Sequence, residues 1–257
     1  MEVITVANNK GGVGKTMQCY QLACHLASKG HKVLAIDLDS QANLSSTFNL
    51  QIQRTLIPEW LIGDVTIEEV MVPSEGKGKL HKNITVIPSS RHMASLSKLL
   101  ILSEGEIRKE AGRKERLMRM RLEQANGMFD YVIIDTPPML GDELIMSLVA
   151  STKILIPTQA QDYSIDGLEE LMDTFEIIKE TENPGLEFAI IPSMVNGRRK
   201  IERQRLEELS SMFKVTPPIR NLVQMQESIS LKKPICAMGK KSRGRQDYTQ
   251  LWESLNL

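Results

Sequence analysis

The feature of this sequence that most constrains its fold is a glycine-rich segment, Asn-Lys-Gly-Gly-Val-Gly-Lys-Thr, at positions 9–16. An apolar run at residues 3–7 precedes it and predicts a strand, and a helix-like pattern follows at residues 17–29. A strand, a glycine loop and a helix in this order form the context that a phosphate-binding loop requires. A glycine-rich turn that binds no ligand is the alternative interpretation of the same residues.

The residue types in this segment suit the phosphates of a nucleotide. Gly11, Gly12 and Gly14 allow backbone N–H groups to converge on one anion, and the helix that begins near Lys15 directs its positive end to the same point. The Lys15 ammonium would interact with the β- and γ-phosphates, and the Thr16 hydroxyl would complete the coordination of a Mg²⁺ ion. The sequence therefore predicts a nucleotide and Mg²⁺ at this loop.

The loop departs from the common pattern G-x-x-x-x-G-K-[ST], because Asn9 replaces the first glycine and Lys10 is an additional cation. In this respect residues 10–16 resemble the deviant Walker A loop of the ParA/MinD ATPases, and nearly the whole chain is similar to the ParA/Soj-type partition ATPases. The resemblance implies ATP and Mg²⁺ as cofactors, and it implies that Lys10 reaches the nucleotide of a second subunit and acts with Lys15 in catalysis. Met17 departs from the family, which usually has a second Ser or Thr there, but its backbone N–H can still serve the α-phosphate. By resemblance, the ATP-binding residues of the loop are Lys10, Gly11, Gly12, Val13, Gly14, Lys15, Thr16 and Met17.

Two aspartates follow the next predicted strand, residues 33–36. Asp37 and Asp39 lie at the carboxyl end of a strand expected beside the phosphate loop, where carboxylates can act on Mg²⁺ and the attacking water. The segment resembles the D-x-D-x-Q-x-N element of ParA proteins. This implies that Asp39 orients the water, as a catalytic and metal-site residue, and that Asp37 supports the water shell of the metal. A helix N-cap with two solvated aspartates is the alternative.

A second strong signal is the apolar run at residues 131–134, which ends in Asp135. Consecutive apolar residues predict a strand that is buried on both faces, and the Asp135 carboxylate is expected to bind Mg²⁺ through water beside the phosphate loop. Residues 135–138, Asp-Thr-Pro-Pro, match the D-x-P-P element of the family. The two prolines predict a stiff loop that reports the state of the γ-phosphate to the dimer face.

Seven predicted strands alternate with helices along the chain. This favours an α/β fold, a mostly parallel twisted sheet with helices on both faces, and the resemblance implies the deviant P-loop NTPase sheet of the SIMIBI type. A long helical stretch at residues 95–124 is expected to break near Gly105 and Gly112. Residues 51–82 are expected to be less regular, apart from a short helix that begins at Thr66. The strands are expected at residues 3–7, 33–36, 84–88, 131–134, 153–158, 188–192 and 215–219.

Charge is unevenly distributed, although the formal net charge is zero. Residues 198–245 carry 13 Lys or Arg and four Glu, a net charge of +9, so the rest of the chain carries −9. This asymmetry indicates a surface that faces a polyanion, and basic residues without interleaved aromatics suit phosphates of DNA of any sequence. A basic face that serves only solubility is the alternative. By resemblance, the DNA-contacting residues are Arg198, Arg199, Arg220, Lys240, Lys241 and Arg243, and the adenine-contacting residues are Met194, Pro218 and Asn221.

The length of 257 residues and the 41% apolar content are compatible with one ATPase domain over residues 1–257. No separate N-terminal DNA-binding domain is expected, because the first predicted strand begins at residue 3. No basic leader and no apolar run near 18 residues is present, so we expect a soluble, cytoplasmic protein.

The three cysteines, Cys19, Cys24 and Cys236, lack C-x-x-C spacing, which argues against a disulfide framework or a zinc site. Cys19 and Cys24 are expected to pack against the sheet.

The resemblance implies a DNA partition ATPase. In such a protein ATP binding forms a homodimer that binds double-stranded DNA non-specifically at the nucleoid, and slow hydrolysis, stimulated by a ParB-like centromere-binding protein, releases it. A MinD-like ATPase that cycles on a membrane is a second hypothesis, but it requires a basic amphipathic C-terminal helix and no Lys or Arg follows Arg245. A nucleotide-switched regulatory ATPase is a third.

In the last predicted helix, residues 246–257, one face is apolar, and core packing is the simplest interpretation. This face carries Tyr248, Leu251, Trp252 and Leu255.

Overall fold

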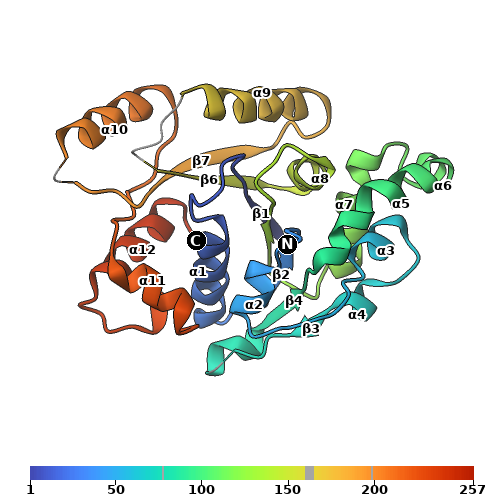
Figure 1. The fold of residues 1–257 in the computed structure, drawn as a ribbon, viewed down its shortest axis with the longest axis horizontal. Helices are drawn as coiled ribbons and strands as arrows, with labels where there is room; N and C mark the ends of the chain where they lie inside the picture. Colours follow the sequence, from blue (N-terminus) through green and yellow to red (C-terminus); the bar gives the residue numbers. More distant parts are fainter. Residues whose placement is uncertain (77, 160–164, 198) are drawn as a thin grey trace.

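A seven-stranded sheet forms the centre of the computed structural model, which describes residues 1–76, 78–159, 165–197 and 199–257 (Figure 1). The strand order is β3-β4-β2-β5-β1-β6-β7, and every pairing is parallel except that of β3 with β4. The mostly parallel α/β fold predicted from the sequence is confirmed. The strands are β1 (Glu2–Val6), β2 (Val33–Asp37), β3 (Val72–Pro73), β4 (Ile84–Ile87), β5 (Tyr131–Asp135), β6 (Lys153–Gln159) and β7 (Glu187–Ser193).

Helices lie on both sides of this sheet (Figure 1). No helix in the described ranges is both long enough and apolar enough to cross a bilayer. The α-helices are α1 (Lys15–Ser28), α2 (Asn43–Thr47), α3 (Ile57–Ile62), α4 (Ile67–Val70), α5 (Leu96–Leu102), α6 (Glu104–Glu110), α7 (Leu117–Leu122), α8 (Asp142–Ala150), α9 (Ile165–Thr181), α10 (Lys200–Met212), α11 (Val223–Ser230) and α12 (Arg243–Ser254). Short 3₁₀ helices are η1 (Lys79–Asn83), η2 (Arg91–Ser95), η3 (Lys114–Arg116), η4 (Glu123–Ala125) and η5 (Ile235–Ala237).

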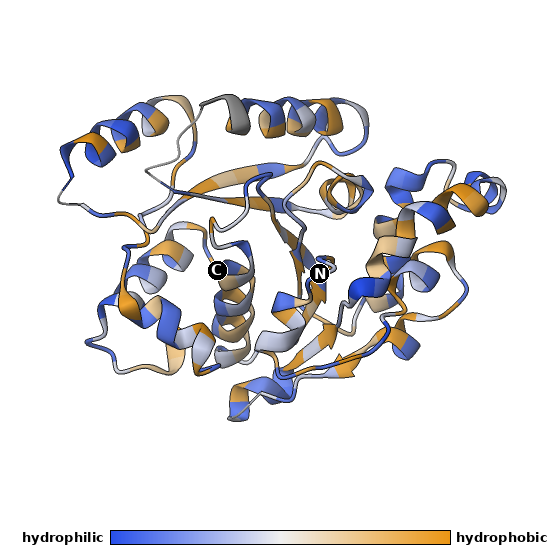
Figure 2. Ribbon diagram, in the orientation of Figure 1, coloured by the Kyte–Doolittle hydropathy of each residue, from blue (hydrophilic) through white to orange (hydrophobic). Residues whose placement is uncertain are grey.

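The side chains of β2 alternate between two apolar clusters, which explains why its sequence is apolar throughout. Val33 and Ala35 pack with residues of α1 and α12, whereas Leu34 and Ile36 pack with residues of α3, α5 and α7. Such burial on both faces is typical of parallel strands covered by helices, and Figure 2 shows the central strands as predominantly hydrophobic. Cys19 and Cys24 of α1 lie in the first cluster, as predicted, and so do the four residues of α12 that share one face: Tyr248, Leu251, Trp252 and Leu255.

The prediction of a strand at residues 215–219 is wrong. Val215 and Arg220 form only isolated bridges with the β7 side of the sheet, and no strand forms between them. Pro217 and Pro218 lack the N–H groups that a strand needs for pairing, so the apolar pattern there cannot extend into a ladder. The seventh strand is instead the two-residue β3, which pairs antiparallel with β4.

The long helical stretch predicted at residues 95–124 is divided into α5, α6, η3 and α7. The first break falls at Ser103 rather than at Gly105, which lies inside α6. The second falls around Gly112, as predicted, and Gly112 has a positive φ of 74°. Helix α3 was not predicted. It buries Ile57 and Trp60 in the core and ends at Gly63.

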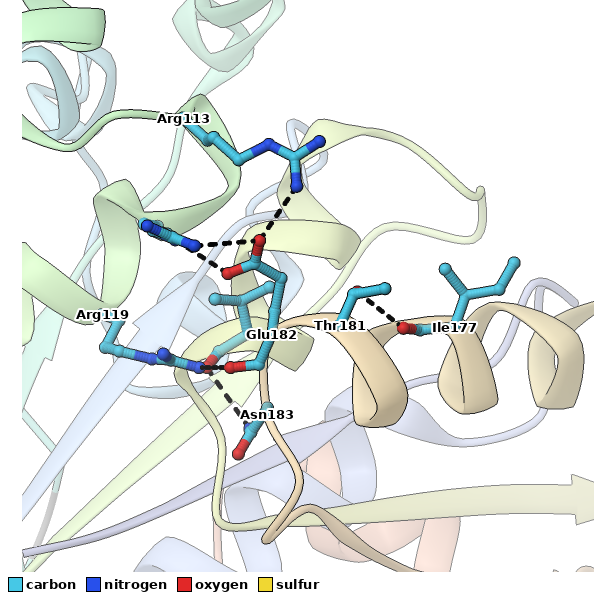
Figure 3. A network of polar contacts seen from close by, with 8 residues as sticks. Arg113, Arg119, Ile177, Thr181, Glu182 and Asn183 are labelled. Carbon is cyan, nitrogen blue, oxygen red and sulfur yellow. Dashed lines mark hydrogen bonds and ion pairs between the residues drawn. The ribbon is translucent and has the colours of Figure 1, made fainter.

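Ion pairs and hydrogen bonds attach the α6–α7 segment to the ends of α8 and α9, and Figure 3 shows those around Glu182. The Glu182 carboxylate, which is 5% exposed, accepts hydrogen bonds from Arg113 and Arg116 at 2.8 to 3.3 Å. Arg119 donates to the carbonyl oxygens of Val149 and Glu182. This network joins the end of α9 to η3 and α7.

Candidate nucleotide-binding site

The glycine loop lies between β1 and α1, and two polar side chains outside it fix its path. Asn8 donates through Nδ2 to the Pro157 carbonyl oxygen at 2.9 Å, and its Oδ1 accepts from the Lys10 N–H at 2.9 Å. Gln159 at the end of β6 donates to the Gly12 carbonyl oxygen at 2.7 Å. Gly12 and Gly14 have φ values of 76° and 98°, which residues with a Cβ rarely adopt. Side chains at the ends of β1 and β6 therefore fix the conformation of the loop.

The two lysines of the loop have different surroundings. Lys15 is 8% exposed, and its Nζ donates to the Lys10 carbonyl oxygen at 3.1 Å. Burial lowers the pKa of Lys15, while the charges of Asp135 and Asp39 act against this shift. The Lys10 side chain is exposed. Lys15 thus lies within its own loop, and Lys10 is accessible from outside.

Two side chains, at the start of α1 and at the end of β5, form a candidate magnesium site. The Thr16 hydroxyl donates to Asp135 Oδ2 at 2.6 Å, and Asp135 Oδ1 is buried without a hydrogen-bond partner among the described residues. Burial, followed by the nearby charge of Asp37, raises the pKa of Asp135 to about 8. A hydroxyl and a buried carboxylate oxygen in need of a partner fit Mg²⁺, which keeps several waters and needs few protein ligands. Within the described ranges, no three His, Cys, Asp or Glu side chains form a protein cage for a metal.

Asp37 pairs in register with Asp135 across β2 and β5, but its carboxylate is already occupied. Asp37 Oδ2 accepts from the Ser45 N–H at 2.8 Å and the Ser45 hydroxyl at 2.7 Å, and Oδ1 accepts from the Asp39 N–H at 3.2 Å. Burial raises the pKa of Asp37 to about 6 although these bonds oppose the shift. Asp39 is less buried, and its Oδ1 caps the N–H of Gln41 at 2.9 Å. The three carboxylates therefore lie in one region, with Asp37 held by Ser45.

Two of the three residues expected at the adenine lie beside the loop. Met194, in a left-handed conformation with φ of 56°, and Asn221 line a small cavity of about 80 Å³ together with Gly14. The Asn221 N–H donates to the Val195 carbonyl oxygen at 3.0 Å, which joins the two segments. Pro218 is exposed and is not part of the cavity lining.

The structure brings the predicted DNA-contacting segments together, but it gives Arg220 another partner. Arg220 forms an ion pair with Asp247 at 2.6 Å, and this pairing raises the pKa of Arg220. Arg199 lies 3.4 Å from the buried Glu202 carboxylate. Lys240, Lys241 and Arg243 are exposed around the N-terminus of α12. Arg198 lies outside the described residues, as does most of the segment that leads into α9.

Sequence reasoning missed Asn8, Ser45 and Gln159, each of which supports a predicted residue. All three are ordinary polar side chains. The partners of Asn8 and Gln159, at Pro157 and Gly12, become neighbours only when the sheet forms, and Ser45 reaches Asp37 through the turn between β2 and α2. No local signal distinguishes them from surface residues.

Comparisons with known proteins agree with this geometry. A family model described as AAA domain matches residues 1–188. The chromosome partitioning protein ParA of Myxococcus xanthus is 33% identical, with 98% of this chain and 87% of that protein covered. The sporulation initiation inhibitor protein Soj of Bacillus subtilis is 32% identical, with 97% and 96% covered.

Solved structures show the same architecture. Cobyrinic acid a,c-diamide synthase from Mycobacterium smegmatis, crystallised with a bound ATP analog and magnesium, superimposes with a TM-score of 0.80 at 25% identity, covering 100% of this chain and 94% of that chain. The family-model match and the full-length identity to ParA and Soj confirm the resemblance found in the loop. The chain therefore belongs to the ParA/MinD family of deviant Walker A ATPases.

Proposed function

We propose that this chain is a ParA-like partition ATPase, active as one domain, that hydrolyses ATP slowly and forms a homodimer when ATP and Mg²⁺ are bound. The observation that carries the proposal is the contrast between the two loop lysines, since Lys15 is buried in its own loop and Lys10 is exposed beside it. An exposed cation on a phosphate loop can complete the site of a second subunit, as an arginine finger does. The relatives named ParA and Soj support this function.

The residues of the site have distinct roles in this proposal. Backbone N–H groups of the loop and Lys15 bind the phosphates, while Lys10 of the second subunit offsets charge that develops on the γ-phosphate. Thr16 and Asp135 would hold Mg²⁺, which would neutralise phosphate charge. Asp39 orients the attacking water, and Asp37, fixed by Ser45, keeps the adjoining segment in place.

The dimer is proposed to bind double-stranded DNA through phosphate contacts and to lie on the nucleoid in the cytoplasm. Lys240, Lys241, Arg243 and Arg199 are exposed, and their charges attract a backbone of any sequence. Arg220 would have to exchange Asp247 for a phosphate, so we assign it mainly to positioning α12. A ParB-like protein is proposed as the partner that accelerates hydrolysis and releases the dimer.

Binding to unrelated DNA duplexes with ATP, with ADP and without nucleotide tests this function. The proposal predicts that DNA binds in the presence of ATP but not with ADP or without nucleotide. The logarithm of the DNA-binding constant should fall with log salt by roughly 0.9 for each phosphate neutralised. Fluorescence anisotropy at several salt concentrations measures both properties. Equal affinity in all three nucleotide conditions, or affinity indifferent to salt, would reject a basic surface assembled by the ATP dimer.

A further inference from the structure

A basic groove contains none of the residues assigned to ATP and DNA. It has a volume of about 690 Å³ and lies where η1 and the end of α11 meet. Three of its lining residues are lysines, Lys79, Lys232 and Lys233, and none of the described lining residues is acidic. Its apolar part includes Leu231, which is 70% exposed. A groove with this lining suits a surface that carries carboxylates around an apolar side chain.

The charges of this groove are available to such a surface. Lys79 and Lys233 are exposed, and in the described part of the chain neither forms an ion pair with a carboxylate. Lys232 donates to Asn49 Oδ1 at 2.8 Å, a neutral partner that leaves its charge uncompensated. The groove therefore attracts negative charge.

Helix α9 carries a matching surface. Asp173, Glu176, Ile177 and Glu180 occupy positions i, i+3, i+4 and i+7, which share one face of a helix, and all four are exposed. Ile177 is 60% exposed in the middle of the three carboxylates, and Figure 3 shows its side chain pointing away from the Glu182 network. The nearby Lys179 ammonium lies over the Phe175 ring, 5.6 Å from its centroid. We call these four residues the acidic face.

The acidic face and the basic groove cannot meet within one molecule. In Figure 1, α9 lies along the upper edge of the molecule, while η1 and α11 lie toward the lower edge. A contact between one copy's acidic face and another copy's groove is therefore heterologous: the first copy retains an unused groove, and the second retains an unused acidic face. Such a contact adds copies in a row and does not close into a two-fold dimer.

We propose that copies of this chain associate head to tail, with the acidic face of α9 in one copy docked in the basic groove of the next. Three carboxylates face three lysines, and Ile177 meets the apolar part of the groove around Leu231. The contact uses neither the phosphate loop nor the residues assigned to DNA, so it is independent of the proposed function. Its charged groups are exposed, so salt weakens it.

Charge reversal in the nucleotide-free full chain tests the contact. Multi-angle light scattering and sedimentation velocity at about 50 mM salt should show a mass that rises with protein concentration beyond a dimer, and about 500 mM salt should return the monomer. The variants K232E/K233E and E176K/E180K should each lower the association constant at least about tenfold, because like charges then face each other. The variant K98E/K109E, which reverses two exposed lysines on α5 and α6, is the matched control and should associate like the wild type.

Mixing the two reversal variants gives the decisive result. The reversed groove then faces the reversed helix, and each variant's unchanged surface faces its unchanged counterpart, so the mixture should associate although neither variant does so alone. Circular dichroism checks that each variant is folded. A chain that stays monomeric or stops at a dimer in low salt, or a mixture that fails to associate, would overturn the proposal. So would a result in which K232E/K233E weakens only DNA binding, which would assign the groove to DNA.

Discussion

Three aspartates share one region of the site, but their surroundings separate their roles. Asp37 is bonded to Ser45, Asp135 accepts from Thr16, and Asp39 is the more accessible of the three. We predict that Asp39→Ala retains ATP binding and lowers the hydrolysis rate at least about 100-fold, the effect typical of a group that acts on the attacking water. Phosphate-release assays measure the rate, and Asp64→Ala, an exposed aspartate elsewhere, is the control. Turnover by Asp39→Ala at the control rate would remove Asp39 from the mechanism.

His25 of α1 makes the stability of the fold sensitive to pH. Its ring lies 6.1 Å from the Trp252 ring, its Nε2 has no hydrogen-bond partner in the described structure, and burial, followed by the charge of Lys29, lowers its pKa to about 4. Between pH 6.5 and 4 the unfolded chain therefore binds a proton that the folded chain does not, so the free energy of unfolding falls as the pH is lowered.

The variant His25→Gln isolates this effect from other titrating groups. Urea unfolding at neutral pH and near pH 4.5 should show a smaller loss of stability for the variant than for the wild type. The expected difference is on the order of 1 kcal/mol, because the partial exposure of His25 screens its charge. Equal losses in the two proteins would contradict the assigned pKa.

The glycine loop, which we propose to bind phosphate, could be located from sequence, because such a loop needs consecutive residues with fixed chemistry. The positions of Asp37, Asp39 and Asp135 at the carboxyl ends of β2 and β5 could also be predicted, since each lies at the end of an apolar run or within three residues of it. The supporting residues Asn8 and Ser45 could not, because the contact of Asn8 depends on a strand distant in sequence, and that of Ser45 depends on how the turn between β2 and α2 folds back. Local sequence pattern thus locates the loop and the aspartates of the candidate site better than it locates the side chains that hold them in place.

At the scale of elements, two glycines show how helix geometry constrains sequence. Gly63 ends α3 with a φ of 96°, and a Cβ there would overlap the Arg121 guanidinium, itself held by Glu110 and the Leu61 carbonyl oxygen. Gly105 lies in α6, and a Cβ there would meet no atom within 4 Å. We predict that Gly63→Ala destabilises the protein by more than about 1 kcal/mol, whereas Gly105→Ala stabilises it by about 0.5 to 1 kcal/mol.

Chemical denaturation of both variants checks this pair of predictions. Each variant adds one methyl group, so each serves as the control for the other. Destabilisation by Gly105→Ala would show that α6 is not helical at that position, and an unchanged midpoint for Gly63→Ala would show that the end of α3 tolerates a side chain.

Six of the seven predicted strands form, because their apolar runs are long enough to be buried on both faces. Residues 215–219 do not form a strand, because Pro217 and Pro218 lack the N–H groups that strand pairing needs. The apolar pattern alone does not take these missing groups into account. Helix α3 escaped prediction because its six residues are too few to show a clear period. Elements fixed by burial could be predicted, and elements fixed by a few specific contacts could not.

At the scale of the whole molecule, the central claim is that two chains share each nucleotide. The carboxyl ends of β1, β2 and β5 lie side by side, since Val6 and Asp37 are both in register with Asp135. The phosphate loop begins at this edge of the sheet, after β1. The exposed Lys10 is part of the loop, and its carbonyl oxygen accepts a hydrogen bond from the buried Lys15. ATP-dependent pairing through this edge would place each Lys10 at the partner's γ-phosphate.

The molar mass of Lys10→Ala in the presence of ATP and Mg²⁺ tests this claim most directly. Light scattering at about 500 mM salt, which screens the head-to-tail contact, should show an ATP-dependent dimer for the wild type and for Lys98→Ala, an exposed lysine remote from the loop, but a monomer for Lys10→Ala, while nucleotide titration shows that Lys10→Ala still binds ATP. A Lys10→Ala dimer as stable as that of the wild type would contradict the account.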